Sequence, residues 1–198
     1  MIADSKNRPY KQVARAEAQQ RTRDALLDAA NEEFAKGSWS KASLDALAAK
    51  AGVTKQTALR HFGSKEGLIE AALRRVSVIV RKERAHAPIG DVPGAVRNLM
   101  DHYERWGDLV MHVLAEEHRF SLVRKGTDRG REVHCEWVAR TFEPQLSSLS
   151  DEMRERRMAQ LVAVCDVYVW KLLRRDMKLG VSQAELALVE LIEGLEEG

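Results

Sequence analysis

Aromatic residues and alternating runs of Val, Ile and Thr are both scarce in this sequence. Aromatics make up 6% of its 198 residues, and no segment alternates such residues with polar ones over the length of a strand. Strands favour β-branched and aromatic side chains at a period of two, so these absences argue against a β-sheet. Hydrophobic residues still make up 44% of the chain, which is enough for a core. We therefore expect an all-α protein.

Cysteine is rare, and long apolar runs are missing. Cys135 and Cys165 lie in apolar helical patterns without a CxxC motif. We expect two buried thiols, with redox sensing as the alternative. No run approaches the roughly 20 apolar residues that cross a bilayer, and the polar N-terminal stretch does not resemble a signal peptide. These features predict a cytoplasmic protein with no membrane partner.

The charge is divided unevenly along the chain. Residues 1–75 carry 14 Lys and Arg against 9 Asp and Glu, a net charge of +5. The remaining residues carry 18 against 21, a net charge of −3. A basic N-terminal part joined to a mildly acidic remainder favours a polyanionic partner at one end of the protein.

The segment from Ser43 to Lys65 has the pattern of two short helices joined by a tight turn. In the first helix, apolar residues recur at steps of three and four: Leu44, Leu47, Ala48 and Ala51. Ser43 is placed as its N-cap, and Gly52 follows where a left-handed C-cap occurs. Thr54 is a good N-cap for the second helix. This arrangement predicts a helix-turn-helix.

The second helix, KQTALRHF, separates its side chains into two faces. Ala58, Leu59 and Phe62 fall on one side, and the polar residues point elsewhere: Lys55, Gln56, Thr57, Arg60 and His61. Cationic, amide and hydroxyl groups bond to phosphate oxygens and to the edges of guanine and adenine in the major groove. This face therefore indicates a reader of duplex DNA.

A family resemblance extends from Arg21 to Leu73. A helix closing in EEFAKG is followed by LDALAAKAGV, by TKQTALRHF and by GSKEGL. In order and spacing these segments resemble the DNA-binding domain of the TetR family of bacterial transcriptional regulators. The resemblance implies an N-terminal three-helix helix-turn-helix DNA-binding domain and a C-terminal helical ligand-binding and dimerisation domain. We place a flexible basic arm at 1–18, the DNA-binding domain at 19–75, and the effector-binding and dimerisation domain at 76–198.

The candidate DNA-binding residues follow from this placement. They are Ser43, Thr54, Lys55, Gln56, Thr57, Leu59, Arg60, His61 and Lys65. Lys55, Gln56 and Arg60 are the expected base readers. Many family members have Leu-Tyr where this chain has Ala58 and Leu59, which shifts the expected phosphate contacts to the hydroxyl, imidazole and ammonium groups nearby. Asp45 would repel the DNA backbone, so if it faces DNA it should accept a bond from cytosine N4.

Helix boundaries can also be anticipated outside this segment. In the arm, Lys6, Arg8, Lys11 and Arg15 form either a solvated tail or an arm that touches phosphates or a minor groove. The first helix is expected over 19–36, and the helix after the reader over about 65–87. The later helices are expected over 92–106, 108–124, 128–147, 151–178 and 183–196.

Two sets of apolar residues are candidates for dimerisation and for effector binding. The last two helices are apolar on more than one face, which predicts a four-helix dimer interface; a crowded monomeric core is the alternative. Its candidates are Leu161, Tyr168, Leu172, Val189 and Ile192. The candidate pocket residues are Met100, Tyr103, Trp106, Met111, Phe120, Trp137 and Phe142, which otherwise form plain core.

Metal and cofactor sites are not expected. His102, His112, His118 and His134, with Glu116, Glu117 and Cys135, have loose spacings without HxxxH or CxxC. A metal sensor therefore remains a minor alternative.

We expect a homodimeric repressor that a small, largely hydrophobic effector releases from a pseudo-palindromic operator. Its partners are then operator DNA, a second copy and the effector. One rival is an effector-independent dimeric DNA-binding protein. The other is an all-helical enzyme, against which the sequence offers no Ser/His/Asp order, Gly-rich phosphate loop or paired carboxylates.

Overall fold

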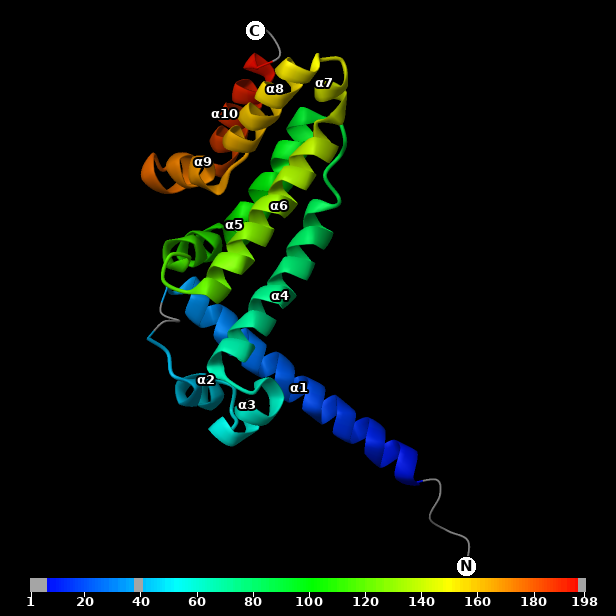
Figure 1. The fold of residues 1–198 in the computed structure, drawn as a ribbon, viewed down its shortest axis with the longest axis vertical. Helices are drawn as coiled ribbons and strands as arrows, with labels where there is room; N and C mark the ends of the chain where they lie inside the picture. Colours follow the sequence, from blue (N-terminus) through cyan, green and yellow to red (C-terminus); the bar gives the residue numbers. More distant parts are fainter. Residues whose placement is uncertain (1–6, 38–40, 196–198) are drawn as a thin grey trace, which may run out of the picture. The chain divides into compact units, whose positions relative to one another are not determined.

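The computed structural model describes residues 7–37 and 41–195, and the side chains of these residues from Gln12 onward. In this part of the chain every regular element is a helix (Figure 1). The elements are α1 (Asn7–Ala35), α2 (Leu44–Lys50), α3 (Lys55–Phe62), α4 (Lys65–Arg84), α5 (Val92–Glu116), α6 (Ser121–Thr141), α7 (Glu143–Ser147), α8 (Asp151–Val164), α9 (Val167–Lys171), the π-helical turn η1 (Leu172–Asp176) and α10 (Val181–Gly194). The expected all-α fold is confirmed, and no helix among the described residues is long and apolar enough to span a membrane.

The chain divides into two compact units, unit 1 (Met1–Arg74) and unit 2 (Arg75–Gly198). Helix α4 begins in unit 1 and ends in unit 2.

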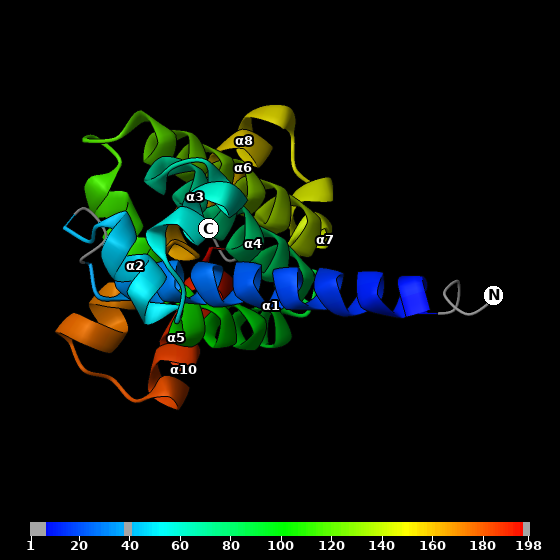
Figure 2. The ribbon, with the colours of Figure 1, turned by 90° about the horizontal axis from the view of Figure 1, so that it is seen from below.

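Unit 1 is a small helical bundle. Helix α2 packs against both α1 and α3, and these three elements are labelled in Figure 2. The buried residues of unit 1 come from all its helices: Leu26, Leu27, Ala30, Phe34, Leu44, Leu47, Ala48, Ala58, Leu68, Ile69 and Ala72. Lys50, the last residue of α2, also pairs with Glu32 and Glu33 of α1 at 2.7 and 2.9 Å. Apolar contacts and a paired lysine thus hold α2 in place.

Helix α1 begins earlier than the sequence pattern predicts. It starts at Asn7, so the expected flexible arm is helical from that residue onward, and residues 1–6 lie outside the described part. Figure 2 shows α1 as one long helix, and its side chains from 12 to 20 are exposed. Arg, Ala, Glu and Gln dominate this stretch and are strong helix formers. The prediction failed because it placed the start of the helix where the apolar periodicity begins.

Unit 2 is built on four longer helices. Helix α5 packs against α6 and α10, and α8 packs against the same two partners (Figure 1). The short α7 joins α6 to α8. The core between them contains Leu99, Met100, Tyr103, Trp137, Val138, Phe142, Leu146, Leu161, Cys165, Trp170, Leu188 and Ile192.

Several predicted boundaries in unit 2 were wrong. A break was expected at Gly107, but α5 runs through it, and a Cβ there would lie 2.5 Å from the ring of Trp170. This glycine therefore allows close packing and does not end a helix. The predicted helix 151–178 is interrupted at Asp166, whose Oδ1 accepts the N–H of Tyr168 at 2.9 Å and starts α9.

Candidate functional site

The turn between α2 and α3 is fixed by side-chain caps and one glycine. Ser43 Oγ accepts the N–H of Ala46 at 3.1 Å, and Thr54 Oγ1 accepts the N–H of Thr57 at 3.2 Å. Gly52 has φ of 71°, in the left-handed region. The next residue, Val53, donates its N–H to the carbonyl of Ala48 at 2.9 Å, which completes a Schellman motif. The predicted capping residues and the glycine C-cap are confirmed.

Helix α3 presents a polar face to solvent. Ala58 is fully buried beneath it, while Lys55, Gln56 and Arg60 are exposed. Within the described residues, neither Gln56 nor Arg60 is held by a hydrogen bond or an ion pair. Both side chains are thus available to a ligand outside the protein. The other candidates on this helix, Thr57, Leu59 and His61, are half-buried.

Lys55 is already paired within unit 1. Its Nζ lies 2.9 Å from Oδ2 of Asp45, and both side chains are more than half exposed. The Asp45 carboxylate, a possible partner of cytosine N4 by sequence, therefore neutralises an expected base reader. Exchange of this partner for a phosphate or a base costs little, because an exposed ion pair is weak.

The chemistry of His61 differs from that of its cationic neighbours. Burial lowers the pKa of His61, and the nearby positive charges of Arg60 and Arg23 lower it further. At neutral pH the ring is therefore uncharged and can contact a phosphate only as a neutral N–H donor.

The junction of α3 and α4 places Lys65. Gly63 ends α3 with φ of 75°, and Ser64 Oγ accepts the N–H of Gly67 at 3.0 Å. A Cβ on Gly67 would lie 2.1 Å from the carbonyl oxygen of Phe62, so only glycine permits this close approach. Lys65, half-buried, is the first residue of α4. The segment GSKEG thus sets this lysine directly after the exposed face of α3.

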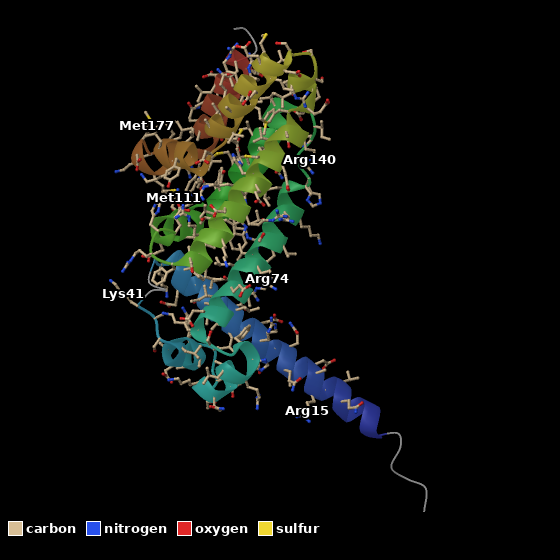
Figure 3. All side chains as sticks on the ribbon, viewed as in Figure 1. Arg15, Lys41, Arg74, Met111, Arg140 and Met177 are labelled. Carbon is tan, nitrogen blue, oxygen red and sulfur yellow. The ribbon has the colours of Figure 1, made fainter. Side chains whose placement is uncertain are left out.

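The predicted pocket residues fall into two groups in unit 2. Met100, Tyr103, Trp137 and Phe142 are buried together in the core, where the Tyr103 hydroxyl donates to the carbonyl of Cys165 at 2.9 Å. Half-buried positions are taken by Trp106, Met111 and Phe120. The structure brings the first four together in one cluster, and Figure 3 labels Met111 on α5.

Sequence reasoning missed one residue in this cluster. Arg84 was not among the candidate site residues, and only 5% of its surface is exposed. Its neighbours in the sequence are charged or small, so no local pattern distinguishes it from a surface arginine.

The predicted dimer residues also separate into two groups. Leu161 and Ile192 are buried in the core of unit 2, and their place in a dimer interface stays a prediction. Their apolar period reflects packing within one chain. Tyr168 and Leu172 are exposed, at 56% and 50%, and Val189 is half-buried.

Potential metal ligands do not come together in the region that the structure describes. No group of three or more His, Cys, Asp or Glu side chains there has an arrangement suited to an ion.

Comparisons with known proteins agree with the geometry of unit 1. Residues 26–72 match the family described as "Bacterial regulatory proteins, tetR family". Over 89 residues the chain is 34% identical to the HTH-type transcriptional regulator AlkX of Mycobacterium tuberculosis (strain ATCC 25618 / H37Rv). That match covers 44% of this chain and 39% of the relative, so it spans well under half of the other protein.

Solved structures resemble the fold over most of the chain. GusR of Salmonella enterica has a TM-score of 0.70 and 21% identity, covering 89% of this chain and 96% of its own. A transcriptional regulator from Rhodococcus sp. Rha1 has a TM-score of 0.68 and 19% identity, covering 91% and 96%. At such identities the likeness concerns the fold alone. The helix-turn-helix segment of this chain is therefore similar to the tetR family of bacterial regulatory proteins, and the solved structures share its fold.

Proposed function

We propose that this protein is a homodimeric transcriptional repressor that binds a pseudo-palindromic operator and is released by a small, largely hydrophobic effector. The exposed face of α3 carries this proposal. Gln56 and Arg60 stand on a short helix whose ends are fixed by Thr54 and Gly63, without partners among the described residues. Rigid presentation of such side chains suits a helix that enters the major groove.

The roles of the side chains follow from their chemistry. Gln56 can bond bidentately to adenine, and Arg60 to O6 and N7 of guanine, while Leu59 can pack on a thymine methyl group. Hydroxyls at Ser43, Thr54 and Thr57, the neutral ring of His61 and the ammonium of Lys65 suit phosphate oxygens. Because α1 is helical from Asn7, its described part is too wide for a minor groove about 6 Å across and suits phosphates only.

Exposed apolar side chains support self-association. They occur along α9, η1 and α10 and the connection before α10: Tyr168, Leu172, Met177, Val181, Leu186 and Leu191. Met177, at the end of η1, is 61% exposed (Figure 3). A two-fold dimer through these elements covers them and supplies two α3 helices. Their separation on DNA should be about 34–36 Å or a multiple of it.

The experiment that tests this function is a binding titration with DNA from the regions flanking the gene. We expect tight binding to one site and weak, strongly salt-dependent binding to unrelated duplexes. Gln56→Ala should relax the preference at one base position at a cost of about 1–3 kcal/mol. Equal weakening on all sequences would assign Gln56 to the backbone, and failure to bind any duplex at low salt would refute the proposal.

One observation favours a second candidate, an effector-independent dimeric DNA-binding protein. Met100, Tyr103, Trp137 and Phe142 are packed as core, as they would be if unit 2 served only for dimerisation. DNA release by a small molecule, measured with the intact protein, decides between the two candidates.

A further inference from the structure

Arg84 carries a buried positive charge in unit 2. It is the last residue of α4, with 5% of its surface exposed. Its Nη2 lies 3.1 Å from Nδ1 of His134, and its guanidinium carbon lies 4.3 Å from the centre of the Trp137 ring. The buried Nε has no hydrogen-bond partner. Among the described side chains no carboxylate forms an ion pair with this guanidinium.

The two histidines near Arg84, His134 and His102, do not supply a negative charge. His134 accepts from Arg84 at Nδ1, so its proton lies on Nε2, which donates to the carbonyl of Val162 at 3.1 Å. Burial lowers the pKa of His102 to about 3, and the Arg84 charge adds to this effect. Both rings are therefore neutral at pH 7. The His102 Nδ1 is also buried without a partner.

The Asp166 carboxylate and the backbone carbonyl of Arg84 both already accept hydrogen bonds from other residues. The Asp166 carboxylate, whose field reaches Arg84, accepts the Tyr168 N–H at the start of α9. The carbonyl of Arg84 accepts from Trp137 Nε1 at 3.1 Å and from Arg140 Nη2 at 2.9 Å, which occupies the last turn of α4. Arg140 lies on α6 (Figure 3). Burying a cation without a counter-charge is costly, and an apolar residue would serve packing better.

We propose that unit 2 binds a small organic monocarboxylate, with the carboxylate on Arg84 and an apolar body against the aromatic side chains around it. This identification rests on the proposed function, because the acid is then the effector. A guanidinium presents a planar fork that matches a carboxylate, and one buried cation neutralises one acid group. The Trp137 ring stacks on His134 and meets Phe142 edge-on at 5.9 Å, so the surroundings favour a flat or aliphatic body.

The position of Arg84 also provides a route for the acid and a connection to the reader. Arg84 stands immediately before the irregular segment 85–91, where Ala85, His86, Pro88 and Ile89 are exposed. Local opening costs least at such segments. The same helix begins with Lys65, directly after the end of α3. Acid bound at the C-terminal end of α4 can therefore bias the helix whose first residue adjoins α3.

The test is the thermal stability of the full-length protein with acids and their uncharged analogues. The probes are acetate, octanoate, dodecanoate, benzoate and phenylacetate, each paired with its primary amide. At a free acid concentration about 100 times Kd, we expect Tm to rise by roughly 5–10 °C for at least one carboxylate and not for its amide. Equal shifts with the amide, or no shift with any acid at millimolar concentration, would overturn the proposal.

Substitutions of Arg84 test whether this residue binds the carboxylate of the stabilising acid. In Arg84→Met the affinity for the stabilising acid should fall by about 10- to 100-fold, because a charged hydrogen bond is lost. Arg84→Lys keeps the charge but not the fork, so it should bind at an intermediate level, and it serves if the Met variant fails to fold. Arg129→Met removes an exposed arginine of α6 and should bind the acid as the wild type does. Undiminished binding by both Arg84 variants contradicts the assignment.

DNA binding is measured on the same samples. If the acid binds through Arg84 and the wild type ignores every duplex, the carboxylate site stands and the proposed repressor function fails. If operator binding is intact and no acid binds, the effector class is wrong and the DNA-binding function stands.

Discussion

At the scale of single residues, the least expected feature of the α3 surface is the pairing of Asp45 with Lys55. A carboxylate on a surface that binds DNA repels phosphates, yet here it lies 2.9 Å from the ammonium of Lys55. The pair lowers the net positive charge of the surface in the free protein. In the proposed function the pair therefore limits nonspecific affinity for DNA more than it affects the stability of the fold, because both side chains are exposed.

Asp45→Asn should strengthen binding to all duplexes. The substitution frees Lys55 for a phosphate, so the slope of log affinity against log salt should steepen by about one unit. Fluorescence anisotropy between about 50 and 200 mM salt measures this slope. Glu155→Gln removes an exposed charge from α8 in unit 2 and should leave it unchanged. An unaltered slope in the Asp45 variant would show that Lys55 does not reach the backbone.

His102 should make unit 2 sensitive to acid. In the folded protein its pKa is about 3 against an ordinary 6.5, with burial as the main cause and the charge of Arg84 as the second. The unfolded chain therefore binds the proton more readily, and the free energy of unfolding decreases as pH falls below about 6.5. The slope approaches about 1.4 kcal/mol per pH unit for this group. His134, whose pKa is also lowered, acts in the same direction.

Urea unfolding at several pH values between 7 and 4.5 measures this loss. His102→Phe should flatten the dependence on pH, because the titrating group is gone. His118→Phe is the matched control, since that side chain is exposed. Identical pH profiles for the wild type and the His102 variant would refute the prediction.

At the scale of elements, glycines act in different ways. Gly52 closes the turn between α2 and α3 through its positive φ, and a Cβ there would meet nothing within 4 Å. Gly107 lies within α5 and leaves room for the Trp170 ring. The first supplies a backbone conformation and the second supplies space, a distinction that only the environment of each residue reveals.

Gly52→Ala should destabilise unit 1 by about 1–2 kcal/mol, since the left-handed conformation is strained for a residue with a Cβ. Gly130→Ala is the matched control, because that glycine lies inside α6 and its added Cβ also meets open space. There the same change should stabilise the helix by about 0.5–1 kcal/mol. Chemical denaturation gives both values, and equal signs for the two variants would contradict the argument.

At the scale of the whole molecule, the proposed repressor requires two copies. In the proposed dimer, the exposed apolar residues of α9, η1 and α10 provide the surface. The contacts of such a dimer would be made by residues that are exposed to solvent in the single chain.

Leu172→Glu and Leu191→Glu should each shift the protein towards monomer in sedimentation experiments at micromolar concentration. Both side chains are about half exposed in the single chain, so the changes remove association without disturbing the core. Val78→Glu on α4 places the same charge at another exposed apolar residue and should leave the dimer intact. A wild type that is monomeric under these conditions would exclude the dimer.

The sequence by itself determined the helix-turn-helix, because its signals are local. Ser43, Gly52 and Thr54 act within a few residues of their own positions, and the apolar spacing that buries Ala48 and Ala58 can be read directly. The family resemblance rests on the same short segment.

Only the tertiary structure decided which apolar residues of unit 2 are core and which are surface. Leu161 and Leu172 belong to the same kind of pattern, but one is buried and the other is exposed. It also decided that Asp45 pairs with Lys55 and that Arg84 is buried without a carboxylate partner in the described chain. These outcomes depend on contacts between residues far apart in the sequence, which no local periodicity encodes.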